Sequence, residues 1–276
     1  MQRRDRNAHP FDPYLIAEHL MTDETHTTPD PDPSPLAIRR RTPRWILIAI
    51  VCVLGGLVAG SIQAVERVRE AAARSKCGQI GVALQNYASG HNGALPPAIV
   101  YSKDGHPLYS WRVLLLPYIE QDSLYKEFQL DEPWDSEHNI KLLDRMPRNY
   151  AAPWDRVVKV PPYHTVIHVF VGKGTPFEEG QVRLWSGPKI RLDKNDFPDG
   201  TSNTLLFVEG GDPVPWTKPE EITFDSNRPI HLQGLFKTGI RAGWADGSRA
   251  YLPSDIDQTT LRAIITRNGG EQVERP

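Results

Sequence analysis

Hydrophobic and polar positions divide the chain into three parts with different patterns. Residues 1–43 are polar and proline-rich. Residues 45–65 contain no charged side chain, and a helix of this length spans about 30 Å, the thickness of a bilayer's hydrocarbon core. Beyond residue 65, apolar and charged residues are interspersed as in a folded domain. The pattern predicts a disordered tail (1–43), one transmembrane helix (44–65) and a folded domain (66–272).

The helical pattern continues past the apolar run. Residues on one stripe, at spacings of three and four, are predicted to be buried: Val65, Val68, Ala72, Ile80, Ala83, Leu84 and Tyr87. The helix is expected to end in the turn-forming residues 89–93, before Pro96 and Pro97.

Further elements follow in a helix-then-strand order. A second helix is predicted from Ser110 as N-cap to Phe128, with a break at Pro117, and a third over residues 136–146. Alternating or β-branched residues predict strands at 165–171, 204–208 and 243–252, the last a hairpin around Asp246 and Gly247. Residues 259–266 predict a short helix. The order favours an α+β fold with the long N-terminal helix packed on an antiparallel sheet.

The apolar run is interpreted as a permanent anchor. Small residues at its far end (Ala59, Ser61, Ala64) would suit signal-peptide cleavage, but signal peptides start near the N-terminus and have a shorter apolar core of about 7 to 15 residues. Arginines directly precede the run: Arg39, Arg40, Arg41 and Arg44. By the positive-inside rule, the N-terminus should be cytoplasmic and the folded domain should lie across the membrane. Gly55, Gly56 and Gly60 would allow another helix to approach.

Charge and cysteine content narrow the function classes. The formal net charge is −2, with a sequence pI near 6.5, and no basic stretch favours nucleic acid as a partner. The two cysteines, Cys52 and Cys77, would lie roughly 37 Å apart on one helix, too far for a disulfide within the chain.

Candidate chemistry is sparse. Residues 193–203 are rich in Asp and Asn, but Phe197 and Pro198 stand where an EF-hand loop needs an oxygen ligand and glycine, so a turn is favoured over a Ca²⁺ site. His164 and His168 would lie about 13 Å apart along a strand, which is too far for the two rings to bind one metal ion. Other candidates show no catalytic context in sequence: the Gly172 loop, the carboxylates Glu120, Glu137 and Glu209, and the hydroxyls of Ser110 and Ser202. We therefore expect no catalytic, cofactor-binding or metal site, and a non-enzymatic protein.

Tryptophans near Pro or Gly offer one alternative function: Trp134, Trp154, Trp185, Trp216 and Trp244. Exposed, they would stack on a glycan or on a protein partner; buried, they would fill the edges of a small core, which is the favoured interpretation.

Seven ordered blocks of sequence resemble a bacterial family known as domain of unknown function 1559, which is abundant in planctomycetes. The blocks are SWRVLLLPYIEQDSLYKEF, LDEPWDSEHNIKLLDRMP, FVGKGTPFEEG, FPDGTSNTLLFVE, VPWTKPEEITFD, GWADGSRAYL and LRAIITRNGGE. The resemblance covers about residues 65–271 and implies a type IV pilin-like or pseudopilin-like protein of the bacterial inner membrane with a periplasmic α+β head. It implies no catalytic residue and no cofactor.

Two departures from the family pattern shape the expected function. No glycine followed by an apolar residue and a glutamate precedes the apolar run, so maturation by a prepilin peptidase is not expected. Phe236 stands where many members have the histidine of a His-x9-Asp-Gly motif. We expect a structural or assembly role in the cell envelope or a secretion-type complex, with the bilayer, envelope proteins or other copies of the chain as partners. The alternative is a tethered module that binds a glycan or another ligand.

Overall fold

The computed structural model describes residues 43–152, 159–178, 190–232, 239–271 and 275. The chain divides into two units, Met1–Val53 and Leu54–Pro276. In the described part of the chain, one helix is long and apolar enough to cross a membrane, over Arg44–Val65, with a mean hydropathy of 2.5 over its most apolar stretch. None of that stretch is buried. Exposed Val, Leu and Ile side chains are unfavourable in water, so this helix supports a membrane anchor.

Helix α1 (Arg44–Gly90) ends where the sequence predicts. The amide of Gly93 donates to the carbonyl of Ala88 (2.8 Å), and both Asn92 and Gly93 have positive φ, as in common helix C-caps. Ile80 and Leu84 of the predicted stripe are fully buried.

The predicted stripe is wrong at its start. Val65 is 48% exposed and Val68 is 68% exposed, and the side chain of Ala72 lies outside the described residues. Among the described side chains of α1, Cys77 is the first that belongs to the main core. Helical periodicity identifies a face that could be buried, but it does not say where along the helix the covering elements begin.

The α+β fold is confirmed. Strands β3 (His164–His168), β5 (Leu205–Pro215), β7 (Ile240–Trp244) and β8 (Arg249–Leu252) form one sheet in the order β3-β5-β7-β8, and all neighbours are antiparallel. Two pairs are smaller. Strands β1 (Ile99–Tyr101) and β2 (Pro107–Ser110) are antiparallel, and β4 (Phe170–Val171) and β6 (Ile222–Thr223) are parallel.

The head's helices are shorter than predicted. The expected helix from Ser110 to Phe128 is divided into α2 (Trp111–Leu114), the 3-10 helix η1 (Leu116–Ile119) and α3 (Asp122–Glu127). Ser110 is the N-cap, as predicted, and Pro117 lies in η1, where its missing N–H disfavours a continuous helix.

Other predicted boundaries shift by a few residues. The expected helix 136–146 is the 3-10 helix η2 (Asn139–Arg145), and the last helix is α4 (Gln258–Ile265). The expected strand 165–171 is two strands, β3 and β4, and the hairpin turn at Asp246 and Gly247 is confirmed.

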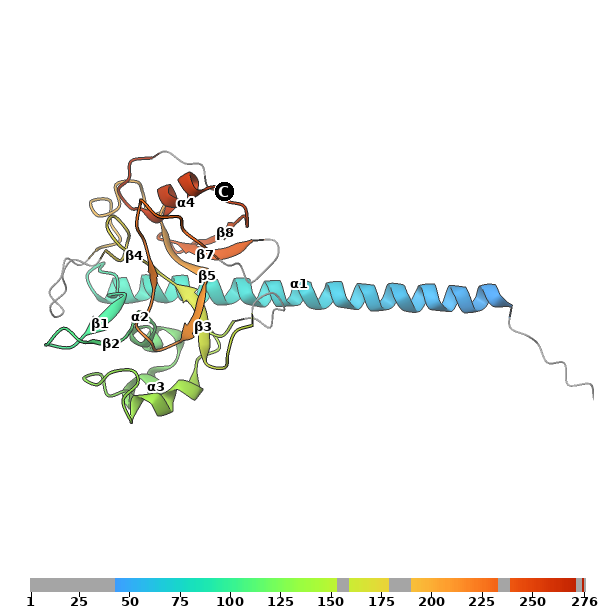
Figure 1. The fold of residues 1–276 in the computed structure, drawn as a ribbon, viewed down its shortest axis with the longest axis horizontal. Coiled ribbons are helices and arrows are strands. Elements are labelled where there is room, and N and C mark those ends of the chain that lie inside the picture. The colour runs from blue at the N-terminus through green and yellow to red at the C-terminus, as the bar shows by residue number, and fades with distance from the viewer. Residues whose placement is uncertain (1–42, 153–158, 179–189, 233–238, 272–274, 276) are drawn as a thin grey trace, which may run out of the picture. The chain divides into compact units, whose positions relative to one another are not determined.

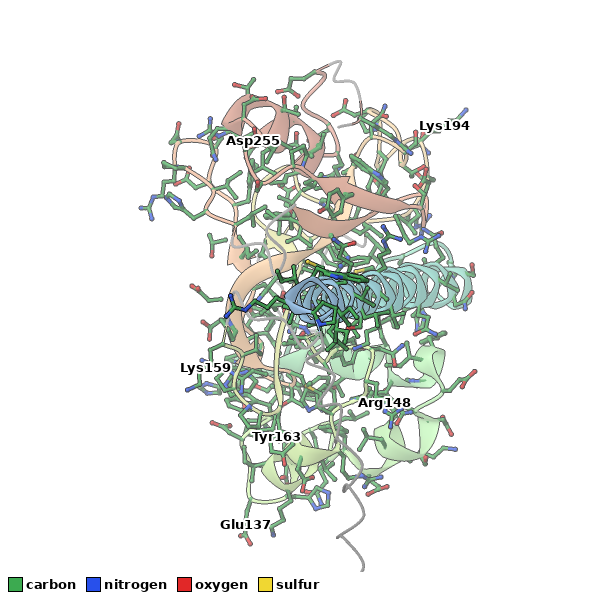
Figure 2. All side chains as sticks on the ribbon, turned by 90° about the vertical axis from the view of Figure 1, so that its right-hand side faces the viewer. Glu137, Arg148, Lys159, Tyr163, Lys194 and Asp255 are labelled. Carbon is green, nitrogen blue, oxygen red and sulfur yellow. The ribbon has the colours of Figure 1, made fainter. Side chains whose placement is uncertain are left out.

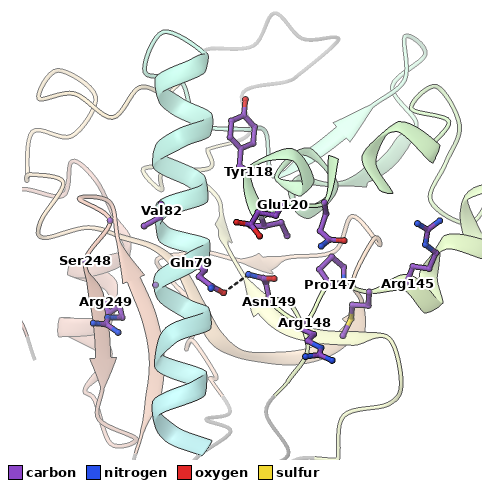
Figure 3. A pocket seen from close by; sticks show the side chains of 15 residues that line it. Gln79, Val82, Tyr118, Glu120, Arg145, Pro147, Arg148, Asn149, Ser248 and Arg249 are labelled. Carbon is purple, nitrogen blue, oxygen red and sulfur yellow. Dashed lines mark hydrogen bonds between the residues drawn. The ribbon is translucent and has the colours of Figure 1, made fainter. Parts of the chain in front are cut away.

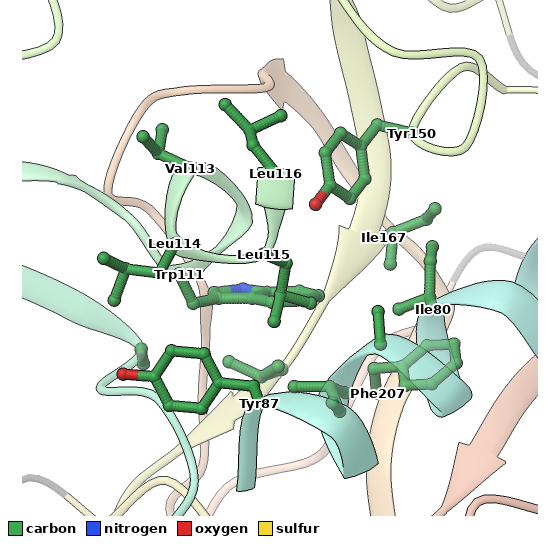
Figure 4. Packing of buried hydrophobic residues seen from close by; sticks show 14 of the residues in the cluster. Ile80, Tyr87, Trp111, Val113, Leu114, Leu115, Leu116, Tyr150, Ile167 and Phe207 are labelled. Atoms are coloured by element: carbon green, nitrogen blue, oxygen red, sulfur yellow. The ribbon is translucent and has the colours of Figure 1, made fainter. Parts of the chain in front are cut away.

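Apolar clusters cover both faces of the sheet. One contains the buried residues of α1, the α2–η1 segment and sheet residues such as Leu206 and Phe207; Figure 4 shows the indole of Trp111 at its centre. The other contains Val208, Ala242 and the buried residues of α4. In Figure 1, α4 and the β7–β8 hairpin lie on one side of α1, and α2 and α3 lie on the other.

The packing between strands β5 and β7 requires a glycine at position 243. Gly243 is the cross-strand partner of Phe207, and a Cβ added to it would lie 2.2 Å from the ring of Phe207. That ring is fully buried. Gly243→Val should lower the free energy of unfolding by about 1–3 kcal/mol through overpacking, measured by denaturant titration of the detergent-solubilised chain. The double variant Phe207→Ala/Gly243→Val is the control: it should lose less stability than the sum of the two single changes, because removing the ring makes room for the added side chain. Fully additive losses would contradict the packing argument.

Candidate functional site

An open cleft of about 1110 Å³ lies along the exposed side of α1 (Figure 3). The following residues line it: Gly78, Gln79, Val82, Tyr118, Ile119, Glu120, Gln121, Arg145, Met146, Pro147, Arg148, Asn149, Gly247, Ser248 and Arg249. The walls come from α1, the end of η1, the segment after η2, and the β7–β8 turn. The fold thus brings together four segments that are distant in the sequence.

Glycines in α1 allow the β7–β8 hairpin to form one wall. A Cβ on Gly81 would lie 3.2 Å from the carbonyl oxygen of Gly247, and one on Gly78 would lie 3.5 Å from the side chain of Arg249. The contact at Gly81 is tighter than an ordinary van der Waals contact and is made to backbone, so a larger residue there would push the hairpin outward, whereas a Cβ at Gly78 would make an ordinary contact. The side-chain Nε2 of Gln85 donates to the carbonyl of Ala245 (2.6 Å) and holds the hairpin against α1.

The opposite wall is fixed by hydrogen bonds. Asn149 Nδ2 donates to Gln79 Oε1 (2.9 Å), which joins the segment after η2 to α1 (Figure 3). The hydroxyl of the buried Tyr150 donates to the carbonyl of Arg112 (2.8 Å). Glu120 caps η1 with φ 62°, a left-handed conformation that is uncommon for a residue other than glycine. This wall is therefore held in one position.

The lining of the cleft carries excess positive charge. Its charged residues are Arg145, Arg148, Arg249 and Glu120. Arg145 forms an ion pair with Glu127, which lowers the pKa of that carboxyl. Arg148 and Arg249 are exposed and form no ion pair with any residue that the structure describes. Exposed Val82, 55% accessible, adds an apolar element at the floor.

The lining of the cleft offers arginine, amide and apolar side chains to a ligand. The lining contains neither His nor Cys, and its one serine, Ser248, donates to Asp246 Oδ1 (2.5 Å) in the hairpin turn. Within the described ranges, no group of three His, Cys, Asp or Glu side chains is placed to hold a metal. Arginines beside an exposed valine and amide side chains match a ligand that combines carboxylates with an apolar group.

A buried ionic network joins α2 to β3 and to the residue before β6. Arg112 forms a two-pronged pair with Glu221 (2.8 and 3.1 Å), and the side chains are 0% and 1% exposed. Glu221 also accepts from Trp111 Nε1 (3.0 Å) and the amide of Val169 (3.0 Å). Burial lowers the pKa of the Arg112 guanidinium, while Glu221 raises it. Solvent does not reach this pair, so its role is structural.

A second buried pair lies between α1 and the sheet. Arg241 Nη1 is 3.2 Å from Glu209 Oε2, and Cys77 Sγ donates to the same oxygen (3.7 Å). Burial raises the pKa of the Glu209 carboxyl, an effect that Arg241 opposes, and burial also raises the pKa of the Cys77 thiol. A thiol held in its protonated form is a poor nucleophile. This cluster also serves packing.

The Asp-rich segment 193–203 is a series of turns. Asp193 Oδ1 accepts from the amides of Asn195 (2.9 Å) and Asp196 (3.1 Å). Asp199 accepts from the amide of Gly270 (3.1 Å), and Asn203 Nδ2 donates to the carbonyl of Asp199 (2.8 Å). These side chains bind backbone groups, as the turn interpretation predicts.

Histidines of β3 have local roles. His168 is buried, and its Nε2 is 2.8 Å from the carbonyl of Asp212. His164 Nδ1 lies 2.8 Å from the carbonyl of Pro162. Each ring is bound by nearby backbone, and neither lines the cleft.

Among the tryptophans considered for glycan stacking, the structure describes three, and all of them pack in or against the core. Trp216 and Trp244 are buried, and Trp134 is half-buried against the main core. Trp154, Trp185 and Phe236 lie outside the described residues. None of the described three lines the cleft.

The cleft itself was not predicted from the sequence. Its arginines, Arg145, Arg148 and Arg249, are separated by up to about a hundred positions and form no motif. The available local signals were the small residues Gly78 and Gly81 on an otherwise amphipathic helix, which indicate close approach of another backbone.

An antiparallel sheet with an apolar cluster on each face, one helix apolar enough to cross a membrane and an open cleft characterise this α+β protein. Residues 66–249 match the family described as protein of unknown function (DUF1559), and the chain belongs to that family. This confirms the resemblance seen in the sequence blocks. No curated protein matches the chain, and neither does any solved structure.

Proposed function

We propose that this protein is a non-enzymatic, single-pass protein of the bacterial inner membrane whose pilin-like head lies in the periplasm and serves a structural or assembly role in the cell envelope or a secretion-type complex. The observation that carries the proposal is helix α1. It contains both the apolar segment Arg44–Val65 and residues of the head's main core. A head whose core includes its own anchor helix is suited to staying at the membrane.

The cleft supports a role in binding another macromolecule. It is open and carries two arginines without an ion-pair partner among the described residues, together with an exposed valine. Both walls are held by packing and hydrogen bonds. A pre-formed surface of this kind loses little entropy on binding.

Glycan binding through the tryptophans has less support. Stacking on a sugar needs an exposed aromatic face, and Trp216 is 0% and Trp244 is 3% exposed. The described aromatic of the cleft, Tyr118, packs edge-on against Tyr87 at 5.5 Å between ring centroids. We therefore favour a protein partner.

Membrane topology gives the direct test. A reporter enzyme that works only outside the cytoplasm should be active when fused after Pro276, because the arginines before Trp45 should remain on the cytoplasmic side. A reporter that works only in the cytoplasm, fused at the same place, should be inactive. The opposite pattern would show that the head is cytoplasmic and would refute the proposed location.

An assembly role has its own test. Crosslinking in native membranes, followed by mass spectrometry, should recover envelope proteins or further copies of this chain bound to the head. Recovery of glycans without protein partners would instead support the alternative function.

A further inference from the structure

We propose that the arginine cleft along α1 binds the acidic tip of a second copy of the same chain, residues 131–140, in a head-to-tail contact. The inference rests on the proposed assembly role and gives it a specific partner. The contact is supported by the charges of the two surfaces, by their apolar groups and by their separate positions on the head.

The acidic tip has the charge that the cleft lacks. It contains four carboxylates, Asp131, Glu132, Asp135 and Glu137, and no Lys or Arg. Asp131 and Asp135 are exposed, and the Glu137 side chain is 96% exposed with Lys141 3.5 Å away. Clefts and ligands of opposite charge attract each other before contact and fix their mutual register.

Apolar side chains on the two surfaces also match. Ile140 at the end of the tip is 39% exposed, and Val82 at the floor of the cleft is 55% exposed. Each is an apolar group surrounded by charged residues. Burying one against the other would remove both from water, which adds a favourable term that does not depend on salt.

The tip is held in shape by Asn139, which is fully buried. Asn139 Oδ1 accepts from the amide of Gln129 (3.0 Å). Its Nδ2 donates to the carbonyls of Gln129 (2.9 Å), Glu132 (3.3 Å) and Pro133 (3.1 Å). These bonds fix the backbone that carries the carboxylates, so binding costs little ordering entropy.

Acidic tip and cleft lie at different places on the head. Figure 2 shows Glu137 at one end of the domain and Arg148 well away from it, closer to α1. A contact between two different surfaces is heterologous, so in a pair one copy retains a free tip and the other a free cleft for further copies. Exposed ion pairs are individually weak, but a common membrane raises the effective concentration of the copies.

Charge reversal of the full-length protein tests the contact. Two differently tagged copies are co-expressed, solubilised in mild detergent and purified through one tag, and the second tag is quantified. Arg148→Glu/Arg249→Glu in both copies should lower the co-purified partner by about tenfold or more, because like charges would then face each other. Asp131→Arg/Asp135→Arg in both copies should give a similar loss. Raising the salt from about 0.05 M to 0.5 M should weaken the wild-type association.

Mixing the two variants gives the decisive result. A cleft-reversed copy keeps the wild-type acidic tip, and a tip-reversed copy keeps the wild-type basic cleft. One wild-type contact can therefore form between them, so the two should associate with each other although neither associates with itself. Lys103→Glu/Lys194→Glu changes the charge equally at exposed positions outside both surfaces and should leave association intact. Arg148→Glu alone, which spares the packing of Arg249 on α1, should show a smaller loss of the same kind.

Several outcomes would overturn the proposal. One is that the wild-type copies fail to co-purify, and another is that the lysine control loses as much co-purified partner as the cleft variant. The others are that the mixture of the two variants shows no recovery of association, or that an unrelated acidic protein is found bound in the cleft. A topology result that refutes the proposed location would leave this experiment readable, because it measures only the contact between copies.

Discussion

Glu221→Ala is expected to lower the free energy of unfolding of the head by about 3–5 kcal/mol, because it leaves the Arg112 guanidinium buried without its counter-charge. Arg112 is 0% exposed and is held 2.8 Å from Glu221. The same substitution removes the acceptor for Trp111 Nε1 and for the amide of Val169. Each donor that stays buried without a partner adds to the loss.

Thermal or denaturant unfolding of the detergent-solubilised chain, followed by tryptophan fluorescence, measures this loss. The double variant Arg112→Met/Glu221→Leu removes both charges and should lose less stability than the sum of the two single changes. Glu127→Ala, which breaks the exposed pair with Arg145, is the control and should change stability little. An equally small effect of Glu221→Ala would show that the buried pair does not hold the fold together.

Sequence patterns predicted the elements that depend on local signals. The hairpin at Asp246 and Gly247 was found because the turn chemistry is local: the Asp246 carboxylate accepts from the amide of Ser248 (2.8 Å), and Gly247 has φ 83°. The start of the second helix at Ser110 follows from the same kind of signal. Such elements require no knowledge of the tertiary fold.

Elements that depend on tertiary partners were missed or misplaced. Strand β5 continues to Pro215 because β3 pairs with its second half, His164 opposite Pro215 and Thr165 opposite Val214; nothing in residues 209–215 alternates clearly enough to predict this. The short strand β6 exists only because β4 lies beside it. These pairings are non-local, and sequence periodicity does not report them.

The cleft could not be predicted for a related reason. Arg148 follows a 3-10 helix and Arg249 starts a strand, and only the packing of the β7–β8 hairpin on Gly78 and Gly81 brings them to one surface. Carboxylates that look alike in the sequence have different environments for the same reason. Glu120 lines the cleft, Glu137 is exposed on the acidic tip, and Glu209 is buried beside Arg241.

Trp216→Ala is expected to be the most damaging change among the tryptophans of the sequence analysis that the structure describes, with a loss of about 3–5 kcal/mol in the free energy of unfolding. The indole is 0% exposed. It stacks on Tyr150 at 5.8 Å between ring centroids and meets the edge of Phe128 at 5.9 Å. Its Nε1 donates to the carbonyl of Leu143 (3.0 Å), so it also fixes η2, the 3-10 helix whose first residues belong to the acidic tip.

Comparison with Trp216→Phe and Trp134→Ala separates the causes of this loss. Trp216→Phe keeps an aromatic ring but removes the hydrogen bond, and it should lose less than the alanine variant. Trp134 is only half-buried against the core, so Trp134→Ala should also lose less. Unfolding of the full-length variants in detergent measures all three. If Trp216→Ala unfolded like the wild type but failed to bind a glycan that the wild type binds, Trp216 would be a ligand-stacking residue and its assignment to the core would be wrong.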